Sequence, residues 1–370
     1  MSEESKYPAL KALCTGLKLT EKVLQTPIQS VITVSADGSL LDSFKVLMRN
    51  NILSAPVSDN GKWIGFLDVR DLVSYVNHLF ANQPKPRRKS WEKKNKEGEK
   101  PADKKDSEQK NLARVVDIAA LEPTITVRYL ARRNPFKPLT PDDNLWNAME
   151  LMAKRYKRIP IVDKDGKLVN IVSQSSVMRL LSNNLQDKKL QAELAKVQAS
   201  TIGTKPVVSV HRDALASEVF KVMSDKNLSG IAVVDSMGGF LCSTQASDLK
   251  LYLVNENLNI LRKPIRQFLA QVRQQELVDL LPNVSVKPTD ALAHVISKLA
   301  VVRMHRVFVA DPKTGLRPTA VISISDLLKH IFGMDPSQAT RSAPSMRVDG
   351  SPSLKPRKEK SAVKPMKPLV

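Results

Sequence analysis

Four short stretches of this 370-residue chain decide its fold: SAPVSD at 54–59, RIPIVD at 158–163, GIAVVD at 230–235 and RVFVAD at 306–311. Each is a mainly apolar run that is too short for a buried helix and ends at an aspartate. Such a run is typical of a β-strand covered on both faces. A turn and a second apolar run follow each one: WIGFLDVRDL, LVNIVSQSSV, FLCSTQASDL and TAVISISDLL. One pattern that recurs four times predicts an internally repeated protein.

The spacing of the aspartates that end these runs gives the length of the repeat. Asp163 and Asp235 are 72 residues apart, and Asp235 and Asp311 are 76 residues apart. Asp59 and Asp163 are 104 residues apart, because a basic insert of about 30 residues lies between them. Apolar residues at helical spacing precede the first strand, as in LWNAMELMAK at 145–154. The predicted unit is therefore β-α-β-β-α, and the fold class is α/β (α+β).

These repeats and two segments poor in apolar residues divide the chain. The N-terminal segment is 1–19, the repeats are 20–83, 114–186, 187–256 and 257–334, the basic insert is 84–113, and the tail rich in Pro, Ser and Lys is 335–370. Insert and tail bury too little to offset the entropy of ordering them, which predicts disorder. Their charge has two interpretations, which both stay open. It either keeps the segments solvated, or it serves as a nuclear address or a polyanion-binding patch.

The composition bounds the function. The net charge of +21 attracts polyanions such as nucleotides, nucleic acid, acidic proteins or anionic lipid headgroups. Two cysteines, Cys14 and Cys242, are too few for a zinc cluster or a disulfide scaffold and favour a reducing compartment. No uncharged apolar run approaches the roughly 20 residues of a membrane helix, and the first residues contain no signal core. We therefore expect no membrane span and a cytoplasmic and/or nuclear protein.

Catalytic motifs are absent from the sequence. None of the five histidines forms an HxxxH metal pair, and neither GxxxxGK[ST] nor GxGxxG occurs. We therefore expect no enzymatic activity, no catalytic residue, no metal site and no cofactor other than a bound nucleotide ligand.

The repeated unit, with SAPVSD, a second apolar strand and then a Ser-x-x-Asp motif, resembles the CBS (cystathionine-beta-synthase-type) family. The resemblance implies that repeats pair into two Bateman modules, stacked as a flat disc with ligand clefts near its centre. Within that family the chain is most similar to the gamma subunit of AMP-activated/SNF1-type kinases. FKPL at 136–139, IGT at 202–204, MHRV at 304–307 and SISD at 323–326 carry this likeness.

The SISD segment has the physical features of an anion site. A strand ends and a helix begins at Ser323, and free N–H groups at a helix start suit a phosphate. The hydroxyls of Ser323 and Ser325 add donors, and Asp326 can accept hydrogen bonds from ribose. His305 and Arg306 begin another strand of the same repeat and can contact phosphate oxygens. Ser-x-x-Asp is also a near relative of the capping box, which is a purely structural alternative.

The resemblance adds nucleotide-binding candidates in the other repeats. They are Lys157, Arg158, Thr204 and Ser229 near phosphate, and Asp71 and Asp248 at the ribose position. Lys157 and Arg158 are expected to reach the repeat three and four cleft across the disc centre. Asp68 stands where the family has Ser or Thr, and its carboxylate should repel phosphate. The cleft between repeats three and four is therefore the stronger prediction.

Two functions are consistent with these features. The first, implied by the resemblance, is a non-catalytic regulatory subunit that binds AMP, ADP or ATP and senses energy state for a SNF1/AMPK-type kinase, with catalytic and scaffolding subunits as partners. The alternative is a stand-alone CBS protein that binds and regulates another enzyme such as a phosphatase. Because its basic segments lack interleaved aromatics, only nonspecific nucleic-acid binding is expected.

Overall fold

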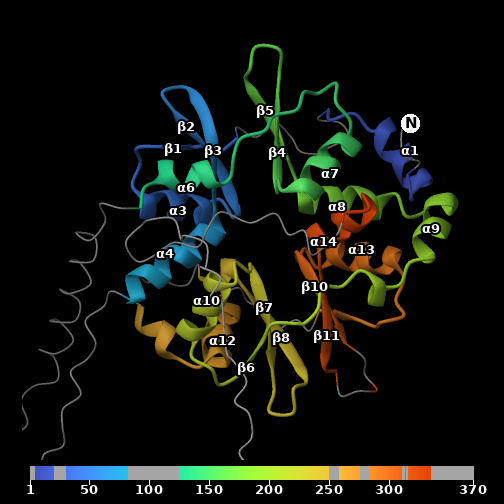
Figure 1. The fold of residues 1–370 in the computed structure, drawn as a ribbon. Helices are drawn as coiled ribbons and strands as arrows, with labels where there is room; N and C mark the ends of the chain where they lie inside the picture. Colours follow the sequence, from blue (N-terminus) through green and yellow to red (C-terminus); the bar gives the residue numbers. More distant parts are fainter. Residues whose placement is uncertain are drawn as a thin grey trace, which may run out of the picture.

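The computed structural model describes residues 5–20, 31–81, 125–249, 258–275, 284–310, 313 and 316–334. The predicted basic insert and tail lie outside these residues. The described part confirms the mixed α/β fold and the β-α-β-β-α repeats, which are drawn as four β-hairpins between two groups of helices (Figure 1).

Repeats one and two form the upper half of the view in Figure 1. The elements of repeat one are β1 (Val34–Ser35), α3 (Leu40–Arg49), β2 (Ser54–Asp59), β3 (Lys62–Asp68) and α4 (Val69–Ala81). Those of repeat two are α7 (Leu145–Lys154), β4 (Arg158–Val162), β5 (Leu168–Ser173) and α8 (Gln174–Asn183). Repeat two has a single parallel bridge, Leu139 to Ile161, in place of an edge strand. The helix α6 (Val127–Arg133) follows the basic insert in the sequence and packs on β3.

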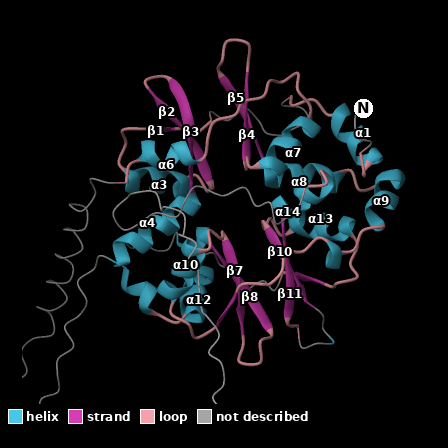
Figure 2. Ribbon diagram, viewed as in Figure 1, coloured by secondary structure: helices cyan, strands magenta, loops and turns pink. Residues whose placement is uncertain are grey.

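Repeats three and four form the lower half, with the hairpins pointing away from those above (Figure 2). The elements of repeat three are β6 (Ser209–His211), α10 (Ala216–Asp225), β7 (Gly230–Val234), β8 (Phe240–Gln245) and the 3₁₀ helix η3 (Ala246–Leu249). Those of repeat four are β9 (Ser285–Val286), α13 (Leu292–Val301), β10 (Arg306–Ala310), β11 (Pro318–Ser323) and α14 (Ile324–Ile331). In both repeats the edge strand is parallel to the first hairpin strand, as in repeat one.

The remaining helices lie at the rim or connect the repeats. They are α1 (Pro8–Gly16), α9 (Lys188–Ala195), η2 (Ala199–Thr201), η4 (Leu258–Arg262) and α12 (Ile265–Gln275). Glu193 on α9 accepts hydrogen bonds from the backbone N–H groups of Ala9 (2.9 Å) and Leu10 (3.0 Å). This carboxylate satisfies two free donors of the first turn of α1 and therefore fixes that helix.

Two hydrophobic cores hold the repeats together, and each joins one repeat from either half. One core contains repeats one and three, where α4 packs on α10; Leu72 and Phe220 are fully buried in it. The other contains repeats two and four, where α8 packs on α13 and α7 on α14; Met149 and Leu328 are fully buried there. Burial of apolar surface is the main stabilising term in folding, so the two halves form one folded unit.

Candidate functional site

Each hairpin ends at a residue that directly precedes the helix after it, which we call the capping position. Strand register places this residue opposite the first residue of the hairpin in every repeat. The pairs are Ser54 with Asp68, Arg158 with Ser173, Gly230 with Gln245 and Arg306 with Ser323. The four capping positions therefore occupy equivalent places, and all four line one cavity of about 400 Å³. A cavity of this size is within the range of small-molecule sites.

In every repeat, the side chain three residues after the capping position accepts a hydrogen bond from the backbone N–H of the residue at that position. The acceptors are Asp71 (3.2 Å), Ser176 (2.8 Å), Asp248 (2.9 Å) and Asp326 (2.9 Å). Ser323 completes the exchange, since its hydroxyl accepts the N–H of Asp326 at 3.1 Å. In this fold the Ser-x-x-Asp motif is a capping device, which was the structural alternative. A ribose contact by these carboxylates stays a prediction.

Seven of the predicted nucleotide-binding residues line the cavity: Lys157, Arg158, Ser229, His305, Arg306, Ser323 and Ser325. Lys157 and Arg158 come from repeat two, so the structure brings them to the residues of repeats three and four. Asp71, Asp248, Asp326 and Thr204 are not among the residues that line it. The backbone of Thr204 pairs with Val321 on β11, and the residue is exposed.

The cavity carries an excess of positive charge. Among the described residues that line it, four carry a guanidinium or ammonium group, Arg70, Lys157, Arg158 and Arg306, and one carries a carboxylate, Asp68. Burial, together with the charges of Arg70, Arg306 and Arg158, lowers the pKa of Lys157 to about 7 against the opposing effect of Asp68. Burial and the same kind of repulsion lower the pKa of His305 to about 4, so the imidazole is neutral at pH 7. Buried cations without matching anions are costly, and a bound anion relieves that cost.

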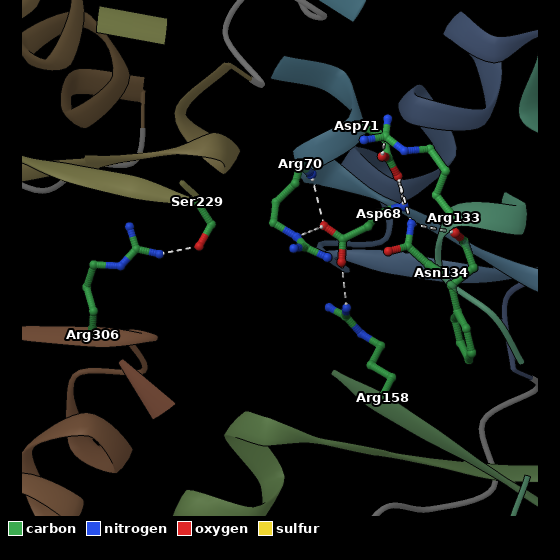
Figure 3. Close-up of polar contacts among 9 residues, drawn as sticks. Asp68, Arg70, Asp71, Arg133, Asn134, Arg158, Ser229 and Arg306 are labelled. Atoms are coloured by element: carbon green, nitrogen blue, oxygen red, sulfur yellow. Dashed lines mark hydrogen bonds and ion pairs between the residues drawn. The ribbon is translucent and has the colours of Figure 1, made fainter. Parts of the chain in front are cut away.

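The carboxylate of Asp68 is held by arginines of two repeats (Figure 3). One oxygen of Asp68 accepts from the backbone N–H of Arg70 (2.9 Å) and from its Nε (3.0 Å), and the other accepts from a terminal nitrogen of Arg158 (3.0 Å). Burial alone would raise the pKa of Asp68, but the two guanidiniums outweigh it and hold the pKa well below its usual range. Asp68 therefore acts as an internal counter-ion.

Asp71 lies behind Asp68 and is in contact with the end of α6 (Figure 3). Its carboxylate accepts from the side-chain amide of Asn134 (3.1 Å) and lies 3.7 Å from a guanidinium nitrogen of Arg133. Burial and the charge of Asp68 raise the pKa of Asp71 to about 6 against the effect of Arg133. The carboxylate of Asp71, which was predicted to contact ribose, is thus already paired with Asn134 and Arg133 of the protein itself.

Arg306 is the counterpart of Arg158 in repeat four, and it is less completely paired. One terminal nitrogen donates to the hydroxyl of Ser229 at 2.5 Å, whereas the other, Nη1, is buried and has no hydrogen-bond partner among the described residues. A Cβ atom at Gly230 would overlap this guanidinium, so a glycine is needed beside it. Burial lowers the pKa of Arg306 to about 10, partly offset by Asp326 and Asp248.

Other polar lining residues were not predicted as site residues. Ser175 is 3.0 Å from Nε2 of His305, and the amide of Gln174 donates to Ser325 at 3.0 Å, so the start of α8 contacts repeat four. Arg70 was also missed. These residues lie next to the capping positions, so aligning the four hairpins by register would have selected them.

No described helix has the length and apolarity needed to cross a membrane. Within the described ranges, no cluster of three or more His, Cys, Asp or Glu side chains could hold a metal ion.

Comparisons with known proteins agree with the repeats. The CBS domain family matches residues 23–78, 127–183 and 199–242. Repeat four has the same order of elements, β9, α13, β10, β11 and α14, and lies outside the matched ranges.

Similar curated proteins are found in fungi. Protein sds23 of Neosartorya fischeri is 28% identical over 198 residues, which cover 51% of this chain and 37% of that protein. Protein SDS23 of Kluyveromyces lactis is 23% identical over 333 residues, which cover 80% and 59%. The chain thus spans about two fifths to three fifths of the length of these curated relatives.

Among solved structures, protein MJ1225 of Methanocaldococcus jannaschii, described as a proposed archaeal homologue of g-AMPK, matches with a TM-score of 0.57. The match has 17% identity and covers 84% of this chain and 99% of that one. At this level of identity the likeness is one of fold. The family matches and the repeated hairpins together identify the chain as a CBS-domain protein with tandem CBS repeats.

Proposed function

We propose that this protein is a non-catalytic regulator that binds an adenine nucleotide in the central cavity. The observation that carries the proposal is the cavity itself, which the buried Arg306 and the half-buried Arg70, Lys157 and Arg158 line together with the carboxylate of Asp68. Phosphate is the anion that arginine forks and helix starts recognise best. The apolar lining residues Ile52, Val69, Ile171 and Ala246 offer surface for a planar base.

Binding of AMP, ADP and ATP to the purified chain, measured by isothermal titration calorimetry, tests this proposal. Arg306→Met should weaken binding at least tenfold, because a charge-assisted hydrogen bond to phosphate contributes roughly 1.5–3 kcal/mol. Arg266→Met is the matched control, since Arg266 is an exposed arginine on α12 that pairs with Asp213 at the surface. A wild-type protein that binds none of the three nucleotides would exclude the proposed function.

The regulated partner is a separate part of the proposal. By resemblance to kinase gamma subunits, the partners are the catalytic and scaffolding subunits of a SNF1/AMPK-type kinase. The alternative is a stand-alone protein that regulates another enzyme such as a phosphatase. Affinity capture from cytoplasmic and nuclear extracts, with identification of the bound enzymes, separates these two. A nucleotide can regulate the partner only if it binds two conformational states of this protein with different affinities. The capture is therefore carried out both with and without AMP, and the amounts of bound enzyme are compared.

A further inference from the structure

The two halves of the cavity have matching arginines, but only one of these arginines is paired with a carboxylate that lines the cavity. Arg158 and Arg306 each begin a hairpin opposite a serine cap, Ser173 or Ser323. Each guanidinium extends across to the neighbouring odd-numbered repeat, Arg158 to Asp68 and Arg306 to Ser229 (Figure 3). The two arginines are therefore equivalent in position, and their partners can be compared directly.

The position of Asp68 has a neutral counterpart in repeat three. Asp68 lies opposite Ser54, and by the same register Gln245 lies opposite Gly230. Both residues line the cavity. Arg158 thus has a carboxylate supplied by the protein, whereas the equivalent place near Arg306 holds an uncharged amide. The buried Nη1 of Arg306, which has no hydrogen-bond partner among the described residues, fits this difference.

The carboxylate of Asp68 makes the contacts that a phosphate group would make. It lies at the start of the 13-residue helix α4, accepts a backbone N–H of the first turn, and contacts two guanidiniums. These are the donors that bind phosphate at helix starts. A phosphate group from outside can reach Arg70 and Arg158 only beside this like charge.

We propose that Asp68 restricts the cavity to ligands with one phosphate group, which binds at Arg306, Lys157 and His305, so that the ligand is an adenosine monophosphate rather than a triphosphate. This inference rests on the proposed function and assigns a specificity-determining role to a residue of repeat one. The additional phosphates of ATP would extend toward a carboxylate that has already neutralised the nearest cations.

Calorimetric titration with AMP and ATP in metal-free buffer tests the assignment. The wild type should bind AMP more tightly than ATP, and Asp68→Asn should shift the ratio toward ATP by about tenfold or more, because it removes a like charge near the polyphosphate. Asp225→Asn changes the net charge equally at an exposed site on α10 and should leave the ratio unchanged.

The reciprocal change keeps the proposal falsifiable if Asp68→Asn fails to fold. Gln245→Asp gives Arg306 an internal carboxylate and should weaken AMP binding by about tenfold. An unchanged AMP to ATP ratio in folded Asp68→Asn, or wild-type AMP affinity in Gln245→Asp, overturns the inference while leaving nucleotide binding in place. If the wild type binds neither nucleotide, the proposed function fails and the inference fails with it.

Discussion

The affinity of the protein for AMP should fall about fiftyfold between pH 7 and pH 9. The pKa of Lys157 in the free cavity is about 7, because burial and the charges of Arg70, Arg306 and Arg158 outweigh Asp68. A bound phosphate dianion favours the ammonium form and raises this pKa. Binding is therefore strongest between about pH 6 and pH 7, where the phosphate is a dianion and Lys157 is largely protonated, and it weakens by about tenfold per unit as the pH rises above the free value, until the pKa of the complex is reached.

The other groups near Lys157 do not titrate in this interval. The pKa of His305 is about 4 and that of Arg306 is about 10. The second pKa of a phosphate ester is about 6, so the ligand is already a dianion above pH 7. The change between pH 7 and pH 9 therefore reports Lys157.

Calorimetry in two buffers of different ionisation enthalpy measures the linked proton. At pH 8 the wild type should take up about one proton on binding AMP, and Lys157→Met should take up none and lose the pH dependence. Lys154→Met is the matched control, because Lys154 is an exposed lysine that pairs with Glu150 on α7, and this variant should behave as wild type. Equal pH slopes in the wild type and Lys157→Met would show that Lys157 is not the group near the phosphate.

The fold could be predicted because its signal is local and repeated. The strand runs that end at Asp163 and Asp235 are each followed directly by the strand with which they pair, and the 72-residue spacing between the two aspartates shows that this hairpin is repeated. The prediction did not include α6 or α9, because these short helices are fixed by contacts with other elements rather than by a repeated pattern. The packing of α4 on α10 and of α8 on α13 could not be predicted either, because each contact joins the apolar faces of two helices that are far apart in the sequence.

The candidate site could be predicted only in part, for two physical reasons. The carboxylates of Asp248 and Asp326 follow a motif that is the same for helix capping and for ribose binding, so the sequence could not separate the two uses. The role of Asp68 depends on Arg158, 90 residues later in the chain. The sequence identified its charge as unfavourable for phosphate, but only the fold shows which cations it neutralises.

Replacing Gly65 with alanine should destabilise the protein by about 3 kcal/mol. Gly65 lies in β3 directly under the end of α6, and a Cβ atom there would overlap the carbonyl of Ala131 and lie 2.8 Å from the carbonyl oxygen of Asn134. These are backbone atoms, which cannot move aside as a side chain does. The substitution must separate α6 from β3 and break the bond from the Phe66 N–H to the Asn134 carbonyl (2.8 Å). Overpacking and the loss of such bonds cost 1–3 kcal/mol, occasionally more.

Gly61→Ala in the turn of the same hairpin is the matched control for this change. Gly61 has a φ of +79° and no atom within 4 Å of a built Cβ, so alanine there should cost only about 1–2 kcal/mol of left-handed strain. Chemical denaturation of both variants gives the difference in the free energy of unfolding. Because Asn134 also contacts Asp71, the Gly65 variant should additionally bind AMP more weakly than the Gly61 variant. Equal stability of the two variants would mean that α6 does not approach β3 as closely as described, and that the support behind Asp68 and Asp71 comes from elsewhere.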